Sequence, residues 1–233
     1  MKNYFTNSFS FFFLLYIVLL SLTLFQSFKQ DFTSIIDFDL TVIHNSLQLV
    51  SNEYPDYTDH TAYSQFLLNG IVYKIVNLFD QSLVTNIKAL TKLENPEIIL
   101  QKLYIISRVL NSTILLITLI FIFKILNNFN IKTYYKYLVI LLIVFTETFW
   151  ANFMILRADA VSICFFWISF YFLLDFINTE KIINLFYVSF FMVLSLLAKV
   201  QIIFLFMFMF FFFLFFFTIE NTKSNVLYKN NFL

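Results

Sequence analysis

Residues 137–177 read YLVILLIVFTETFWANFMILRADAVSICFFWISFYFLLDFI, an apolar run with Arg157 and Asp159 near its middle. A second apolar run, Leu185–Ile219, carries Lys199 near its middle. As single helices these runs would measure roughly 50–60 Å, whereas the hydrocarbon core of a bilayer is about 30 Å thick. Each run therefore predicts a hairpin of two membrane helices with its charges at the turn.

The composition indicates a polytopic membrane protein. Hydrophobic residues make up 61% and charged residues 12% of the chain, unlike an ordinary soluble domain. The formal net charge of +1 gives no reason to expect a nucleic-acid partner. A single cysteine, Cys164, excludes a disulfide within one chain, and the sequence has no zinc-ligand spacing and no calcium-type loop. We therefore expect no metal ligands and no cofactor, and the sequence leaves open whether a divalent ion takes part.

The predicted fold class is all-α, a membrane helix bundle of about six spans with a large outer first loop. The six expected spans are Phe9–Phe28, Tyr104–Leu126, Tyr137–Met154, Val161–Ile177, Leu185–Leu197 and Ile202–Ile219. The first segment could instead be a cleaved signal peptide. Its length and the lack of a small-residue cleavage site before Lys29 favour an uncleaved anchor.

Lysine and arginine in the short connections predict a cytoplasmic N-terminus. With that orientation the inner side carries seven of these cations and the outer turns carry two, Arg157 and Lys199. The inner cations are Lys2, Lys124, Lys132, Lys136, Lys181, Lys223 and Lys229. We thus expect a multi-pass protein of a plasma membrane, and more specifically of a bacterial inner membrane. Residues 1–219 form the expected membrane core, and residues 220–233 form a polar cytoplasmic tail.

The outer loop, residues 29–103, is predicted to be structured. Leu40, Ile43, Leu47 and Val50 form an apolar stripe, and Asp39 stands where a helix N-cap would. Further on, Ser64–Phe79 is apolar except for Asn69, Gly70, Lys74 and Asn77, which share one face. This pattern favours an interfacial helix lying flat. The alternative is a short true span, which would invert every later helix.

The outer face gathers acids and bases from three separate loops. They are Asp37, Asp39, Asp59, His60, Arg108, Arg157, Asp159 and Lys199. Carboxylates suit a general base, whereas arginine and lysine suit an anionic group such as a phosphate. A lipid phosphate would lie at that depth, so the topology alone predicts a polar site against the bilayer. Glu147, inside an apolar run, is expected to face the bundle.

Five stretches, in order along the chain, resemble the GT-C glycosyltransferases of the PMT- and ArnT-like branch. They are 39–50 (DLTVIHNSLQLV), 57–68 (YTDHTAYSQFLL), 106–112 (ISRVLNS), 156–160 (LRADA) and 197–200 (LAKV). Two departures are Leu40, where the family often has a second acid, and Thr61, where proline is common. Family members are usually more than twice as long, so the resemblance covers an N-terminal membrane portion.

The resemblance implies transfer of a sugar from a polyprenyl-phosphate donor to a glycan, lipid or protein acceptor at the outer face. In that reading Asp39 is the general base and Asp159 assists or orients the acceptor. The cations Arg157 and Lys199 neutralise the leaving lipid phosphate. The pair Asp59 and His60 belongs to the same substrate-binding region. Partners implied are the lipid-linked sugar and membrane lipids.

Each of these residues has a simpler structural alternative. Asp39 and Asp159 could be plain helix caps, with Asp37 a near alternative to Asp39 as base. Arg157 and Lys199 could be turn residues that extend to the interface, and Asp59 and His60 could be solvated. A transporter or channel component, or a non-catalytic assembly subunit, is the competing function. The lack of glycine and proline within the predicted spans argues against transport.

Overall fold

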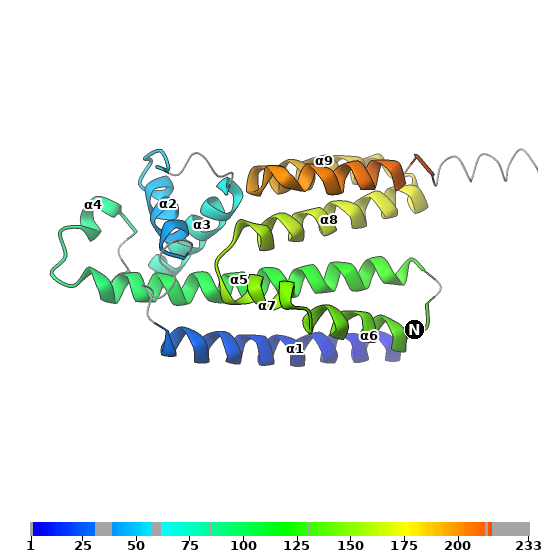
Figure 1. Cartoon of the computed structure of the whole chain (residues 1–233), viewed down its shortest axis with the longest axis horizontal. Helices are drawn as coiled ribbons and strands as arrows, with labels where there is room; N and C mark the ends of the chain where they lie inside the picture. Colours follow the sequence, from blue (N-terminus) through cyan, green and yellow to red (C-terminus); the bar gives the residue numbers. More distant parts are fainter. Residues whose placement is uncertain are drawn as a thin grey trace, which may run out of the picture.

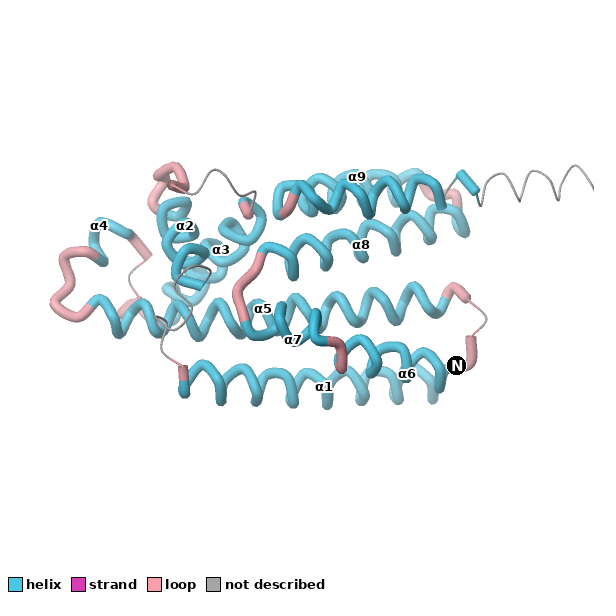
Figure 2. The backbone as a smooth tube through the Cα atoms, in the orientation of Figure 1, coloured by secondary structure: helices cyan, strands magenta, loops and turns pink. Residues whose placement is uncertain are grey.

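The computed structural model describes residues 2–30, 39–56, 62–83, 85–129, 131–212 and 214–215, with the side chains of α1 described from Ser8. These residues form helices joined by short loops, without a strand in those ranges (Figures 1 and 2). The α-helices are α1 (Lys2–Lys29), α2 (Thr41–Val50), α3 (Tyr63–Phe79), α4 (Ile87–Leu90), α5 (Pro96–Asn127), α6 (Thr133–Val144), α7 (Glu147–Met154), α8 (Ala158–Thr179) and α9 (Ile182–Ala198). A further apolar helix, Val200–Phe212, begins with a 3-10 turn, η3 (Val200–Ile202).

The long helices run side by side and the shorter outer helices lie at one end of the bundle (Figure 1). We call this end, which carries α2, α3 and α4, the loop end. The loop end also holds the C-terminal end of α1, the start of α5 and the connection between α7 and α8. The opposite end holds the start of α1 and the end of α5. We call it the N-terminal end.

Several apolar helices indicate a membrane protein. Three of them, Ser8–Lys29, Pro96–Asn127 and Ala158–Thr179, are long and apolar enough to cross a membrane, and a bent pair makes a fourth candidate. Among the described residues the expected count of six spans is not confirmed, because α9 has 17 residues and the described part of the next apolar helix is Val200–Phe212. At 1.5 Å per residue, 17 residues extend only about 26 Å. Both expected hairpin breaks are present, at residues 155–157 and at Lys199.

The bent pair consists of α6 and α7, which meet at 58°. The bend contains neither proline nor glycine. Instead, the Thr146 hydroxyl accepts a hydrogen bond from the Phe149 N–H and donates one to the Ile143 carbonyl. Glu147, the first residue of α7, is exposed. The prediction that Glu147 faces the bundle is therefore wrong, because the break places it on the outer surface.

Helices α2 and α3 pack closely against each other at the loop end. A Cβ atom at Gly70 would lie 2.6 Å from Val50 Cγ2 and 3.3 Å from the Ser46 carbonyl oxygen, so only glycine permits this approach. Asn69 is buried on the same side of α3. Apolar side chains cover the exposed side of α3: Leu67, Ile71, Ile75, Leu78 and Phe79. Asn69 and Gly70 of the polar face of α3 thus pack on protein, whereas Lys74 of that face is exposed. The apolar face of α3 is available to lipid.

Candidate functional site

Four of the predicted site residues lie at the loop end: Asp39, Arg157, Asp159 and Lys199. They come from three connections that are far apart in the sequence: the start of α2, the α7–α8 connection and the break after α9 (Figure 1). Asp37, Asp59 and His60 lie outside the described residues. The structure therefore brings the two predicted catalytic acids to one end of the bundle.

Asp39 is fully buried between the outer segment and the bundle. Its Oδ1 accepts a hydrogen bond of 2.7 Å from the Leu156 N–H, in the connection that precedes α8. Leu40 occupies the N-cap position of α2, where no side chain of the described residues caps the helix. Asp39 is thus a tertiary contact, and the simple helix-cap alternative is wrong.

The environment of Asp39 favours its neutral form. Burial raises the pKa of Asp39 above its ordinary value, and the Leu156 hydrogen bond and the charge of Arg108 oppose part of that rise. Because a carboxylate is costly to keep charged away from water, this residue takes up a proton more readily than an exposed aspartate does. A carboxyl group with a raised pKa is a stronger base when ionised.

Arg108 is the cation beside Asp39. Its Nη1 lies 3.9 Å from Asp39 Oδ2, and its guanidinium lies over the Tyr104 ring, 5.5 Å from the centroid. The Arg108 side chain is 1% exposed, and none of its three nitrogens makes a hydrogen bond with the described residues. Sequence analysis placed Arg108 at the outer face; the structure buries it inside the bundle, next to the predicted base.

A polar stripe on α5 explains how Arg108 is positioned. Spacings of three and four residues put its buried members on one face of the helix: Tyr104, Ser107, Arg108, Asn111 and Ser112. Ser107 pairs with Tyr73 of α3, and Ser112 pairs with Thr23 of α1. The Asn111 side chain donates to the Asn152 carbonyl of α7 at 2.7 Å. The stripe therefore joins α5 to three helices, and its period was a signal for Arg108 that sequence analysis missed.

Asp159 and Lys199 form the second ion pair of the loop end. The Lys199 ammonium contacts Asp159 Oδ1, and the two side chains are 35% and 31% exposed. Arg157, not Asp159, occupies the N-cap position of α8, so the cap alternative for Asp159 is also wrong. The pair joins the two predicted hairpins, because Asp159 begins α8 and Lys199 follows α9.

Serine contacts hold α8 and α9 together below this pair. The Ser162 hydroxyl donates to the Ser195 carbonyl at 3.0 Å, and the Ser195 hydroxyl donates to the Ser162 carbonyl at 2.7 Å. From α3, the Ser64 hydroxyl donates to the Leu194 carbonyl at 2.7 Å. Small hydroxyl side chains allow helices to approach closely within a membrane, so these contacts fix the geometry of the Asp159–Lys199 pair.

The resulting site has two acids in different environments. Asp39 is buried beside Arg108, whereas Asp159 is partly exposed beside Lys199, with Arg157 on the connection between them. Cations that remain accessible at a helix turn can bind an anionic group, and a carboxyl with a raised pKa can exchange a proton. Among the described residues, no group of three or more histidine, cysteine, aspartate or glutamate side chains is arranged to hold a metal ion.

Comparisons with protein-family models, with curated proteins and with solved structures find no match to this chain.

Proposed function

We propose that this chain is the N-terminal membrane portion of a GT-C-like glycosyltransferase. It transfers a sugar from a polyprenyl-phosphate donor to a glycan, lipid or protein acceptor at the loop end, which is the outer face of the membrane. Asp39 takes the proton of the acceptor hydroxyl as that oxygen attacks the anomeric carbon and the lipid phosphate departs. Asp159 orients the acceptor, and Arg157 and Lys199 stabilise the negative charge that develops on the leaving phosphate. Asp59 and His60 are proposed to bind substrate beside them.

The observation that carries this proposal is the hydrogen bond between the Leu156 N–H and Asp39 Oδ1. It joins Asp39, the proposed base, to the connection that bears Arg157 and Asp159, although Asp39 and Leu156 are 117 residues apart. In an enzyme of this kind the base and the phosphate-binding cations must act on one sugar, so they must share one region.

The burial of Asp39 sets a requirement on the mechanism. The acceptor must approach Asp39 Oδ2, the oxygen that has no hydrogen-bond partner among the described residues and lies 3.9 Å from Arg108. Opening the outer segment by a small movement of α2 would expose this oxygen. Catalytic groups are often incompletely arranged before substrate binds, and closing the site again would exclude water from the transfer.

Sugar transfer by the purified chain in liposomes tests the proposal. Tritium-labelled mannose, glucose and arabinose, each linked to polyprenyl phosphate, serve as donors, and cell-envelope lipid, glycan and protein fractions serve as acceptors. We expect Asp39→Asn to reduce transfer by about 10²–10⁴-fold, which is the contribution of a general base. The asparagine oxygen can still accept the Leu156 hydrogen bond, so the variant separates chemistry from folding.

Asp56→Asn is the matched control, because Asp56 is an exposed acid of the same outer loop. It should transfer sugar at the unaltered rate, and circular dichroism should give the same helix content for all three proteins. Unaltered transfer by Asp39→Asn would exclude Asp39 as the base. No transfer from any of the three donors by the unaltered chain would reject the glycosyltransferase.

One observation favours a second candidate, a transporter or channel component. The α6–α7 pair is a broken helix, a feature of many transporters, and Glu147 is exposed at the break. A helix of this chain is therefore broken without glycine or proline, so the lack of these residues in the predicted spans does not exclude a transporter. Proton and potassium flux through the same proteoliposomes tests it: a transporter should conduct and lose flux in Glu147→Gln but not in Asp39→Asn.

A further inference from the structure

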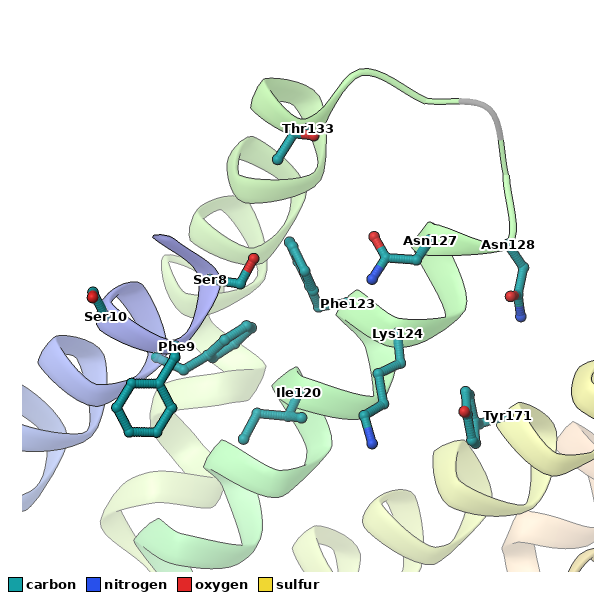
Figure 3. A pocket seen from close by; sticks show the side chains of 11 residues that line it. Ser8, Phe9, Ser10, Ile120, Phe123, Lys124, Asn127, Asn128, Thr133 and Tyr171 are labelled. Carbon is teal, nitrogen blue, oxygen red and sulfur yellow. The ribbon is translucent and has the colours of Figure 1, made fainter. Parts of the chain in front are cut away.

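A cavity of about 1010 Å³ lies at the N-terminal end of the bundle, away from the acids described above (Figure 3). Its walls come from the start of α1, the last turns of α5, the start of α6 and one residue of α8, Tyr171. Ligand pockets usually enclose about 300–1,000 Å³, so this space would hold a molecule larger than an inorganic ion.

The lining of the cavity divides into an apolar wall and a polar mouth. Phe9, Ile120 and Phe123 form the wall, and polar side chains such as Asn127 and Thr133 form the mouth (Figure 3). Phe12 adds a fourth apolar lining residue. Lys124 contributes the one charge among the described lining residues, and no acid lines the cavity there. This distribution fits an amphiphile with an apolar tail and a negatively charged head.

Lys124 is held at the cavity by aromatic rings. Its Nζ lies 4.9 Å from the centroid of Phe121 and 5.5 Å from that of Tyr171. Cation–π contacts of this length leave the ammonium donors free to bind an anion on the other side. The nearest acid along α8 is Asp175, one turn beyond Tyr171, and its Oδ2 accepts a hydrogen bond from Asn184. Asp175 does not line the cavity.

Asn127 adds a second donor beside Lys124. The two residues are three apart on α5 and so share a face of the helix. The Lys136 ammonium donates to Asn127 Oδ1 at 2.9 Å, which fixes the amide with its nitrogen on the side of Lys124 (Figure 3).

We propose that this cavity binds one anionic phospholipid. Its phosphate accepts hydrogen bonds from Lys124 Nζ and the Asn127 amide, and an acyl chain lies along the wall of Phe9, Phe12, Ile120 and Phe123. The apolar wall favours a lipid over a free phosphate. The short connections at the N-terminal end, with the first turn of α6, carry Lys132, Lys136 and Lys181, whereas those at the loop end carry Arg157 and Lys199. By the positive-inside rule, which counts short connections, the N-terminal end faces the leaflet richer in anionic lipids. This inference is independent of the proposed glycosyltransferase activity.

Native mass spectrometry of the purified chain tests the proposal. The detergent solution contains equal amounts of phosphatidylglycerol and phosphatidylcholine with identical acyl chains. The unaltered chain should retain one phosphatidylglycerol in preference to phosphatidylcholine. Lys124→Gln should bind it about fivefold more weakly, the change expected for one lysine near an anionic lipid surface. Lys181→Gln removes an exposed lysine at the same end of the bundle but outside the cavity, and should bind as the unaltered chain does.

Three results would overturn the proposal: equal retention of the two lipids, unaltered retention by Lys124→Gln, and displacement of the lipid by millimolar inorganic phosphate. The last result would assign the cation to a free anion. A second measurement does not depend on the lysine variant. Phe9→Trp places an indole on the apolar wall, where phosphatidylglycerol with brominated acyl chains should quench its fluorescence more than brominated phosphatidylcholine does; equal quenching would also reject the site.

Discussion

The two ion pairs at the loop end have the same chemistry and opposite environments. In the Asp39–Arg108 pair the side chains are 0% and 1% exposed, and their nearest charged atoms are 3.9 Å apart. In the Asp159–Lys199 pair about a third of each side chain is exposed, and the charged atoms are in direct contact. The buried pair is loose and under-bonded, whereas the accessible pair is tight. A closer, hydrogen-bonded contact between Asp39 and Arg108 would stabilise the core more than the observed separation does.

The difference indicates distinct roles for the two pairs. A buried pair loses its hydration, and without good hydrogen bonds the attraction between its charges does not fully offset that loss. Removing either partner nevertheless destabilises the fold, because it leaves the other charge buried without a countercharge. An accessible pair gains little because water screens it. We infer that Arg108 is retained to set the charge state and position of Asp39, and that Asp159 and Lys199 remain available to a ligand.

Loss of Arg108 should have the largest effect on stability. Arg108→Gln leaves the Asp39 carboxylate buried without a countercharge, so we expect the free energy of unfolding to fall by about 3 kcal/mol, at the lower end for a broken buried pair. Denaturant unfolding in detergent micelles, followed by tryptophan fluorescence, measures this change. Adding Asp39→Asn removes the stranded charge and should restore most of the loss, which a double-mutant cycle quantifies.

Lys102→Gln is the matched control on the same helix. Lys102 pairs with Asp80 at 3.1 Å, but the pair is exposed, so its loss should leave the unfolding transition unchanged. If Arg108→Gln and Lys102→Gln behave alike, the contrast between the buried and the accessible pairs is wrong.

Sequence reasoning placed all four residues of the two pairs at one face, but it did not predict which acid pairs with which cation, for a physical reason. Apolar runs too long for one span require a turn, and charges within such a run mark it, so the breaks at Arg157 and Lys199 follow from length and hydropathy. Which residues a helix buries against its neighbours also depends on tertiary packing. The contact between Asp39 and the Leu156 N–H uses a backbone group, which any residue type supplies, so no side-chain pattern could indicate it.

The remaining differences have local causes. The Thr146 hydroxyl contacts accompany the 58° bend that sequence analysis read as one straight span, since threonine in an apolar run is not a recognised breaker. The spacing of the polar residues from Tyr104 to Ser112 was sufficient to predict one buried polar face on this helix. The sequence prediction for this segment used only its hydropathy. The segment with Asn69 and Gly70 was correctly assigned as one helix, although these two residues of its polar face are buried, Gly70 against α2, while Lys74 is exposed.

The pH dependence of stability should distinguish the environment of Asp39 from those of exposed acids. Because the pKa of Asp39 is raised, the folded state holds its proton more tightly than the unfolded state does. Its contribution is therefore most favourable below the ordinary value of 3.8 and is lost as pH rises through the folded pKa. We expect the melting temperature of the unaltered chain, relative to Asp39→Asn, to fall across this window.

Asp56 provides the control of opposite sign. Hydrogen bonds from Gln48 and His44 lower the pKa of Asp56, so its contribution is present above 3.8 and is lost as pH falls. Relative to Asp56→Asn, the unaltered chain should therefore gain stability as pH rises. A melting-temperature difference for Asp39→Asn that rises with pH in the same way would show that burial does not control the charge of Asp39.

Loss of the accessible Asp159–Lys199 pair should have the smallest effect on stability, and the salt dependence of that effect should show whether solvent screens the pair. Lys199→Gln is expected to lower the free energy of unfolding by less than about 1 kcal/mol. Raising the ionic strength to about 1 M shortens the screening length to about 3 Å, so it should abolish this small difference while leaving that of Arg108→Gln in place. Melting temperatures of the three proteins at low and high salt measure both effects. A Lys199→Gln difference that persists at high salt would mean that this pair is shielded from solvent, and would remove the reason for assigning it to a ligand.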